Sequence, residues 1–387
     1  MTKDVVIVGA GMVGLSVALA LQKKGLQVAI IESKVLPNRL SDERIETRVS
    51  AINHNSQKFL KEIGVWSHIS QNRISPYYTM SVWDHEITNN ISITAEELSE
   101  HSLGHIVENQ LIVETLLIEI AKTDIEILDN VQIQEIQILQ YVAKVKYSNG
   151  EIETDLIIGA DGANSFVRDY FNFETKTSDY NHTAIVATVE LEKSHKQTAY
   201  QRFYDKGVLA FLPLETENKC SIVWSVKTDY AEYLNTLTDI EFKKQLATEI
   251  NDTFGGINLL TKRITFPLFE RYAKKYVQDK VALVGDACHS LHPLAGQGVN
   301  LGFKDAQSLI TVISDAFEKG RIIGDISTLD KYQRQRKLDN VKMMLLMRSF
   351  KEAFASDNVT VSNLRKIGLG VVNSNNMIKR AIVKQAL

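Results

Sequence analysis

The stretch VVIVGAGMVG, residues 5–14, joins an apolar run to three glycines at a fixed spacing. Its first four residues predict a short buried parallel strand, and residues 12–24 have the composition of a helix. Gly25 supplies a helix stop, and residues 28–31 predict a second strand that ends at Glu32. Strand, glycine-rich turn, helix and second strand in this order are the βαβ unit that holds a dinucleotide.

Each glycine of the turn has a separate predicted task. Gly9 permits the tight turn, Gly11 lets the backbone approach a pyrophosphate, and Gly14 lets the helix pack closely on the strand. Met12 and Val13 open the helix, whose N-terminal N–H groups attract the anion. The alternative is a glycine-rich turn without a ligand.

Glu32, at the end of the second predicted strand, limits which dinucleotide the βαβ unit binds. Glu32 is placed to accept hydrogen bonds from a ribose hydroxyl, and its charge disfavours NADP in this site.

Residues 5–21 are uncharged and imitate a secretion signal, but Asp4 and the regular glycines favour a folded βαβ unit.

Composition limits the class of protein. The chain has 387 residues, 44% hydrophobic and 24% charged, which is typical of a soluble globular protein with two to three domains. Its two cysteines, Cys220 and Cys288, are too few for a disulfide framework and indicate a reducing cytoplasm. The nine histidines lack ligand spacing, so we expect no metal site.

The net charge of −3 argues against a nucleic-acid partner, yet it conceals an asymmetry. Residues 331–387 hold twelve basic and three acidic residues, a net charge of +9. The preceding 330 residues therefore carry −12. The sequence predicts a basic C-terminal region on an acidic body.

Two later segments identify the dinucleotide. A strand at residues 156–158 runs into GADGANSFVR, and a strand at residues 281–284 runs into GDACHSLHP and then LAGQGVNLG. These segments resemble the DG and GD motifs of the group A flavoprotein monooxygenases, the family of para-hydroxybenzoate hydroxylase. The resemblance implies an FAD cofactor and NAD(P)H as a transient co-substrate.

The resemblance also implies positions in the site. Asp286 would bind the ribityl chain, Gly298 and Asn300 would approach the flavin ring, and Asp161 would serve both FAD and the nicotinamide. By alignment, Arg48 lies near the flavin and pyrophosphate and Asn109 near the adenosine half, unless Arg48 is an ordinary surface arginine. Further cofactor contacts are implied at Gly285, Pro293 and Val299.

The residues themselves support part of this assignment. A helix from Val299 onward would aim backbone N–H groups at an electron-rich flavin. Asp286 could instead be a turn-forming residue, and His289 is interpreted as a satisfied loop histidine.

A narrower resemblance covers nearly the whole chain. RVSAI at 48–52, LKEIGVW at 60–66, GHIVEN at 104–109 and LAFLPL at 209–214 are similar to the ubiquinone-biosynthesis flavin hydroxylases. Within that group the chain looks most like the 2-polyprenylphenol hydroxylases that act at ring position five. Three alternatives stay open: a paralogue that acts at another ring carbon, an aromatic-catabolism monooxygenase, and a flavin-binding assembly subunit without activity.

The implied reaction uses NAD(P)H and O₂ to hydroxylate a polyprenylated phenol through a flavin hydroperoxide. His292 is the candidate for an assisting group, unless its role is structural. Phe211, Pro213 and Trp224 are candidate walls of an apolar substrate pocket, and each is equally well explained as core. A small acidic substrate would instead need an anchor such as Arg202 or Tyr204.

The predicted fold is α/β (α+β, two domains), with a Rossmann-like FAD-binding domain interleaved with an antiparallel-sheet substrate domain and a helical C-terminal tail. The predicted ranges are 1–75, 100–165 and 276–330 for the FAD domain, 76–99 and 166–275 for the sheet domain, and 331–387 for the tail. Strands are expected at 185–191, 201–204, 208–214 and 220–226, and a helix at 239–253.

The tail carries Met343, Met347, Phe350 and Phe354 on one helical face, a packing stripe. Its basic residues predict a peripheral contact with an anionic inner membrane by a cytoplasmic protein, or pairing with the acidic body or with another protein of ubiquinone biosynthesis.

Overall fold

The computed structural model describes residues 1–36, 47–83, 91–290 and 298–355, without the side chains of 344 and 346–355. His292, Pro293 and most of the basic tail, together with the side chains of Met347, Phe350 and Phe354, lie outside these described parts.

The glycine-rich turn belongs to an eight-stranded sheet. Its centre is parallel, in the order β19-β11-β1-β2-β8. The strands of this centre are β1 (Thr2–Val8), β2 (Val28–Ile31), β8 (Glu126–Leu128), β11 (Gly150–Gly159) and β19 (Val281–Leu283). Antiparallel additions are β9 (Ile133–Ile138), β10 (Ala143–Tyr147) and β18 (Val277–Gln278).

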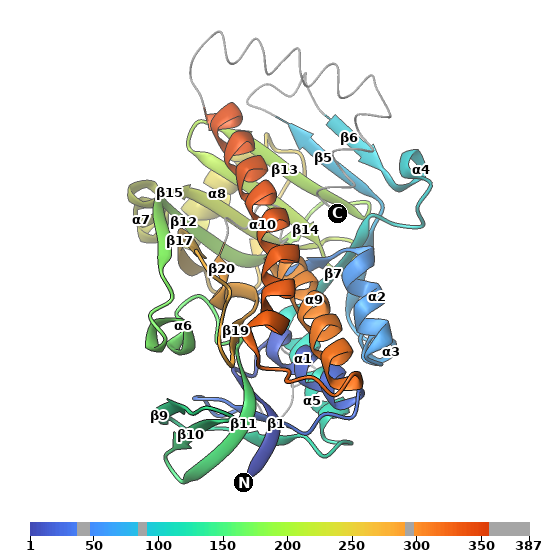
Figure 1. Ribbon diagram of the computed structural model, residues 1–387. Coiled ribbons are helices and arrows are strands. Elements are labelled where there is room, and N and C mark those ends of the chain that lie inside the picture. Colours follow the sequence, from blue (N-terminus) through green and yellow to red (C-terminus); the bar gives the residue numbers. More distant parts are fainter. Residues whose placement is uncertain (37–46, 84–90, 291–297, 356–387) are drawn as a thin grey trace.

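Helix α1 (Met12–Gln22) lies against this sheet between α5 (Asn109–Ile120) and α9 (Gly298–Glu318) (Figure 1). All residues from Gly14 to Leu21 are buried, so every side of this part of α1 is covered by neighbouring strands and helices. This explains why residues 5–21 are uncharged: they form the buried part of β1, the glycine turn and nearly all of a core helix.

A nine-stranded, mostly antiparallel sheet forms the other half of the molecule (Figure 1). Helices α7 (Thr228–Thr236) and α8 (Asp239–Glu249) cover one of its faces. The strands are β5 (Thr79–Trp83), β6 (Ile91–Thr94), β12 (Thr175–Leu191), β13 (Thr198–Tyr204), β14 (Gly207–Pro213), β15 (Lys219–Lys227), β16 (Ile257–Leu259), β17 (Ile264–Ala273) and β20 (His289–Ser290).

A three-stranded sheet packs on the opposite face. It consists of β3 (Val49–Ile52), β4 (Ile74–Tyr77) and β7 (Gly104–Glu108), with α2 (His54–Glu62), α3 (Trp66–Ser70) and α4 (Ala95–Leu98) nearby. Two short helical segments complete the turns at the site: α6 (Phe166–Tyr170) and the 3₁₀ turn η2 (Gly285–Ala287).

Helix α10 (Ile326–Ala355) joins the two halves. It packs along α9, touches β18 of the first sheet and reaches β13 of the second (Figure 1). Among the described residues, none of the helices has the length and apolarity that crossing a bilayer needs.

The predicted α/β class and the expected strands are confirmed; several further strands were not expected, and two helix bounds differ from the prediction. Helix α8 ends at Glu249 because Asn251 and Asp252 adopt left-handed backbone angles, φ +53° and +48°. Strand β17 was not expected. Helix α10 begins five residues before the predicted boundary at 331, and the domain boundaries themselves stay a prediction.

Candidate active site

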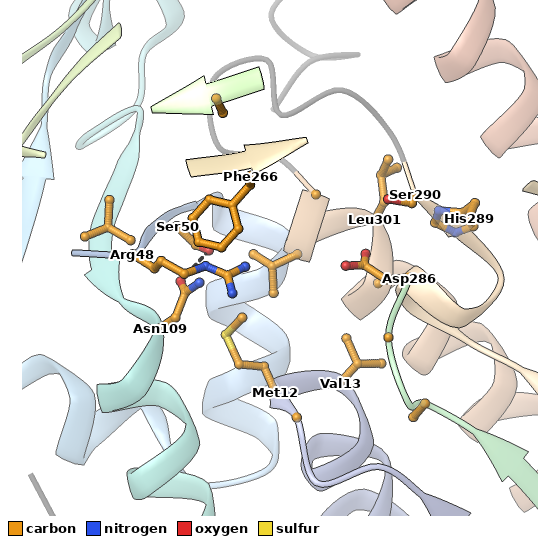
Figure 2. Close-up of a pocket in the computed structure, with 18 of the residues that line it drawn as sticks. Met12, Val13, Arg48, Ser50, Asn109, Phe266, Asp286, His289, Ser290 and Leu301 are labelled. Carbon is orange, nitrogen blue, oxygen red and sulfur yellow. Dashed lines mark hydrogen bonds between the residues drawn. The ribbon is translucent and has the colours of Figure 1, made fainter. Parts of the chain in front are cut away.

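A cavity of about 410 Å³ lies at the carboxyl ends of β1, β11 and β19, where doubly wound sheets bind ligands. Its far wall is the nine-stranded sheet (Figure 2). The lining residues are Gly11, Met12, Val13, Arg48, Val49, Ser50, Asn109, Ala160, Gly162, Ala184, Val186, Val223, Phe266, Leu268, Val284, Asp286, His289, Ser290, Gly298, Val299, Leu301 and Gly302.

The glycine turn has the geometry that its spacing predicts. Gly9 has φ +107°, and a Cβ there would lie 2.5 Å from the Ala160 carbonyl oxygen. A Cβ on Gly14 would lie 2.1 Å from the Gly9 carbonyl oxygen, so only glycine lets α1 approach the turn. A Cβ on Gly11 would meet no atom of the described parts of the chain within 4 Å, because Gly11 faces the cavity. Among the described residues no side chain caps α1, which leaves its first N–H groups available.

Glu32 does not line the described cavity, but it holds the turn that does. Its carboxylate accepts hydrogen bonds from the backbone N–H groups of Ala10 (2.8 Å) and Lys34 (3.0 Å). The carboxylate thus sits at the end of β2 beside the glycine turn, as its spacing from Gly14 predicts.

Arg48 and Asn109 meet on one wall of the cavity (Figure 2). The Arg48 guanidinium lies over the Phe266 ring, 5.0 Å from its centroid. The Asn109 N–H donates to the Arg48 carbonyl (3.0 Å), and its side-chain oxygen accepts from the Ser50 hydroxyl (2.7 Å). Arg48 is exposed toward the cavity, between the glycine turn and the nine-stranded sheet.

Asp286 projects into the cavity from η2, after the positive φ of Gly285 (+60°) (Figure 2). Its side chain reaches solvent through the cavity, while protein surrounds it on the other sides. This burial raises the pKa of its carboxyl, and the nearby His289 and Arg48 act in the opposite direction. Gly285 itself packs under the turn, close to the Val13 side chain.

Asp161 lies beside the cavity rather than in its described lining. Its Oδ2 accepts from the Val167 N–H (3.1 Å), while Oδ1 has no partner among the described residues. Burial raises the pKa of this carboxyl above its ordinary value. Arg168, which is buried, donates to the carbonyls of Ala163 and Ala287 and thereby ties the DG segment to the GD turn.

The start of α9 lines the cavity with Gly298 and Val299. Asn300 points elsewhere: its amide donates to the Ala51 carbonyl (2.7 Å) and accepts from the Asn53 N–H (3.2 Å). The Asn300 side chain therefore fastens α9 to β3, and only its backbone remains for a cofactor.

The apolar wall was missed by sequence reasoning. It consists of Ala184 and Val186 from β12, Val223 from β15, and Phe266 and Leu268 from β17. Their alternation was visible in the sequence, but which alternate face meets the cavity depends on strand pairing far along the chain.

The predicted pocket walls Phe211, Pro213 and Trp224 are not among the described lining residues. Phe211 and Trp224 are fully buried on the other face of the sheet, where they pack under α8. Successive residues of a strand point to opposite faces, so the neighbouring Val223 lines the cavity and Trp224 does not. Pro213 is buried at the end of β14, opposite Cys220.

Arg202 and Tyr204 are also turned away from the cavity. Arg202 forms a buried pair with Glu249 (3.4 Å), and the Tyr204 hydroxyl accepts from the Trp224 indole (2.6 Å). Neither side chain is free to anchor an acidic substrate at this cavity.

Comparison with known proteins identifies the family. The family described as "FAD binding domain" matches residues 2–345. The 3-demethoxyubiquinol 3-hydroxylase of Escherichia coli (strain K12) is 32% identical, over 99% of this chain and 98% of its own length. The chain belongs to the FAD-dependent monooxygenases.

Other members agree with this assignment. The mitochondrial ubiquinone biosynthesis monooxygenase COQ6 of Drosophila melanogaster is 33% identical, over 99% of this chain and 89% of its own length. In fold, this monooxygenase is similar to the crystal structure of P. aeruginosa PqsL in complex with 2-aminobenzoylacetate. The TM-score is 0.81 at 19% identity, covering 96% of this chain and 100% of that chain.

The described residues fit FAD. The uncapped start of α1, the open space at Gly11 and the unpartnered Oδ1 of Asp161 are what a dinucleotide pyrophosphate and its polar neighbours require. FAD is the cofactor of this monooxygenase.

Proposed function

We propose that this monooxygenase hydroxylates the ring of a polyprenylated phenol in ubiquinone biosynthesis, with NAD(P)H as the reductant and O₂ as the oxygen source. The observation that carries the proposal is the apolar wall opposite the cofactor turns. Ala184, Val186, Val223 and Leu268 are aliphatic, and Phe266 adds an aromatic ring. Such a wall suits an uncharged ring with a hydrocarbon chain.

The cavity also argues against a small acidic substrate. Among its described lining residues, only Arg48, Asp286 and His289 have ionisable side chains. Asp286 and His289 lie on the cofactor turn, and Arg48 is stacked on Phe266. None projects from the apolar wall itself, so a carboxylate bound among its aliphatic side chains would lose hydration with only Arg48, at Phe266, as a charged partner.

The chain's own residues have positioning tasks in this reaction. When bound, FAD supplies the electron transfer and the oxygen chemistry. The apolar wall excludes water, and Phe266 and Leu268 offer apolar contacts for the substrate ring. Gly298 and Val299 bring the start of α9 to the cavity, where N–H groups can favour negative charge on the cofactor. His292 stays our candidate for assisting the phenol.

We propose ring position five as the site of hydroxylation. The relative named for 3-hydroxylation of demethoxyubiquinol favours a second candidate, a hydroxylase that acts at another carbon. Both share the apolar wall and differ in the substituents that the substrate already carries.

Deletion of the gene followed by mass spectrometry of the lipids tests the proposal. An accumulated polyprenylphenol without a second ring oxygen supports position five. An accumulated demethoxyubiquinol supports the second candidate. An unchanged quinone pool would sink the assignment to this pathway.

The membrane contact is proposed from α10. Its exposed face carries Arg334, Lys337 and Lys342, with Leu338 and Leu345 between and beside them. A basic face that also displays leucines fits the surface of an anionic bilayer, where a polyprenylated substrate would reside.

A further inference from the structure

A buried carboxylate, Asp305, joins the cofactor turn to the C-terminal helix. Asp305 lies on α9 with no solvent exposure. On the cavity side its Oδ2 accepts from the Gly285 N–H (3.3 Å) and contacts His289 Nε2 (2.5 Å). His289 lines the cavity and Gly285 begins the turn that carries Asp286. Asp305 Oδ2 therefore holds Gly285 and His289, two residues of the GD turn that borders the cavity.

The other half of its contacts come from α10. Asp305 Oδ1 accepts from Arg336 Nε (2.8 Å) and from the Asn340 side-chain amide (3.2 Å). Arg336 is held in turn by Asn340 Oδ1 (2.8 Å) and by Asp339 (3.1 Å). Arg336 and Asn340 are buried, so this contact is part of the core and not a surface pair.

The charged groups of the cluster shift one another's pKa values. Asp305 and Arg336 hold each other ionised: burial would raise the pKa of Asp305, but His289 and Arg336 outweigh it and the pKa is lowered. For His289, burial alone would lower the pKa, yet Asp305 outweighs it and the pKa is raised. With Asp286 and Asp339 included, three carboxylates lie near two cations, Arg336 and His289. Loss of the His289 proton would remove the cation that accompanies Asp286 in the lining of a cavity that receives an anionic dinucleotide.

We propose that Asp305 and Arg336 are positioning residues of the FAD site, which keep His289 as an imidazolium on the cavity wall and thereby make α10 a part of the cofactor site. If Asp305 served only to join α9 to α10, its contacts with Arg336 and Asn340 would be enough. The contacts with Gly285 and His289 extend the cluster to the turn that faces the cofactor.

The elements packed around His289 each contribute a titratable group near its ring. Helix α9 contributes Asp305, α10 contributes Arg336 and the turn contributes Asp286. The ring of Tyr276, just before β18, lies 6.3 Å from the imidazole, and β17 contributes Tyr272 as the strand partner of His289. Asp305 is the group that raises the His289 pKa most, so neutralising Asp305 should lower it.

The test measures FAD affinity of the full-length apoprotein by flavin fluorescence across about pH 5.5 to 9. Asp305→Asn should weaken FAD binding about tenfold at neutral pH, comparable with the loss of one charge-assisted contact. Affinity should recover as the pH falls, because His289 regains its proton only at lower pH. In the wild type the decline in affinity should begin at higher pH. Arg336→Lys, which keeps the charge, should retain most of the affinity.

A matched control is the buried Arg202–Glu249 pair, which lies away from the cavity. Glu249→Gln should lower the melting temperature of the apoprotein and leave the FAD affinity and its pH profile unchanged. Equal FAD affinities for wild type and Asp305→Asn would overturn the proposal, as would a weakened affinity with an unshifted pH profile. If Asp305→Asn does not fold, His289→Gln decides: weakened binding without the wild-type decline at high pH supports the proposal, and wild-type binding refutes it.

Discussion

At the scale of single residues, Arg48 stands between the two halves of the active site. Its guanidinium stacks on Phe266 of the substrate wall, while it shares the cavity lining with Met12 and Asp286 of the cofactor turns. It is also one of two groups that lower the pKa of Asp286. Arg48 therefore bears on cofactor binding and on the shape of the substrate wall at once.

Replacement of Arg48 should affect the cofactor more than the fold. Arg48→Ala removes a cation from the cavity, so FAD affinity should fall about tenfold, or about 1.4 kcal/mol. Titration of the apoprotein with FAD measures the change. Lys206, whose ammonium lies 4.7 Å from the centroid of the Tyr230 ring away from the cavity, is the matched cation–π control. A similar loss of affinity in Lys206→Ala would contradict this account.

The raised pKa of Asp161 leads us to expect that its effect on the free energy of unfolding depends on pH. Burial raises its pKa in the folded state, so the ionised carboxyl costs stability at pH values above the unfolded-state pKa of about 3.9. Asp161→Asn keeps an acceptor for the Val167 N–H and removes the charge. The variant apoprotein should melt at a higher temperature than the wild type at pH 7, and the difference should shrink as the pH approaches about 4. A lower melting temperature of the variant at pH 7 would refute the argument.

At the scale of elements, two glycines of the same turn have different roles: Gly14 is needed for packing of α1, and Gly11 for FAD binding. Gly14→Ala places a methyl group 2.1 Å from the Gly9 carbonyl, so it should destabilise the fold by about 1–3 kcal/mol. Gly11→Ala places one in the open cavity and should leave apoprotein stability unchanged while weakening FAD binding. Thermal melts and FAD titrations of both variants check the contrast. Loss of stability in Gly11→Ala would show that the turn is packed on that side too.

The two faces of the nine-stranded sheet should likewise respond differently to substitution: one face affects stability and the other affects activity. Phe211→Ala opens a hole in the core under α8 and should cost about 3–5 kcal/mol of stability, with FAD affinity unchanged. Ala184→Phe fills the cavity wall and should abolish hydroxylation while the purified protein stays yellow with FAD. Denaturant unfolding and product analysis measure the two effects. Full activity of Ala184→Phe would mean that the ring binds elsewhere.

The same elements explain how far the sequence could be interpreted. The glycine turn, Glu32 and the GD turn were predictable because their chemistry lies within short segments. The apolar wall was not, since it depends on the pairing of β12 with β15 and β17. Strand β17 was missed because Pro267 argues against a central strand; it is tolerated where β17 pairs only with β12, since β20 pairs further along at Arg271 and Tyr272. The contact of Asp305 with Arg336 is equally non-local.

At the scale of the whole molecule, the basic region has two parts that differ in how they can be tested. Helix α10 begins at Ile326 and its buried Arg336 holds Asp305. A truncation at residue 331 would therefore damage the cofactor site. A chain that ends at residue 355 keeps the helix and removes only the last basic segment.

Vesicle flotation should then show electrostatic membrane binding. The full chain should float with vesicles that contain anionic lipid and be released by salt. Replacement of the exposed Arg334, Lys337 and Lys342 by glutamate should abolish flotation, at about 1 kcal/mol for each basic residue lost. Truncation after residue 355 should weaken it. Equal flotation of all three proteins would remove the membrane proposal and favour a protein partner.

The contact between Asp305 and Arg336 also has a consequence for synthesis of the chain. The ribosome makes the glycine turn, residues 9–14, long before α10, residues 326–355, at about 5–20 residues per second. Strand β19 must likewise wait to join β1 and β11 in the parallel sheet. Until residue 340 has left the ribosome, the nascent chain lacks the contacts of Arg336 and Asn340 with Asp305, so FAD should bind more tightly after that point than before it.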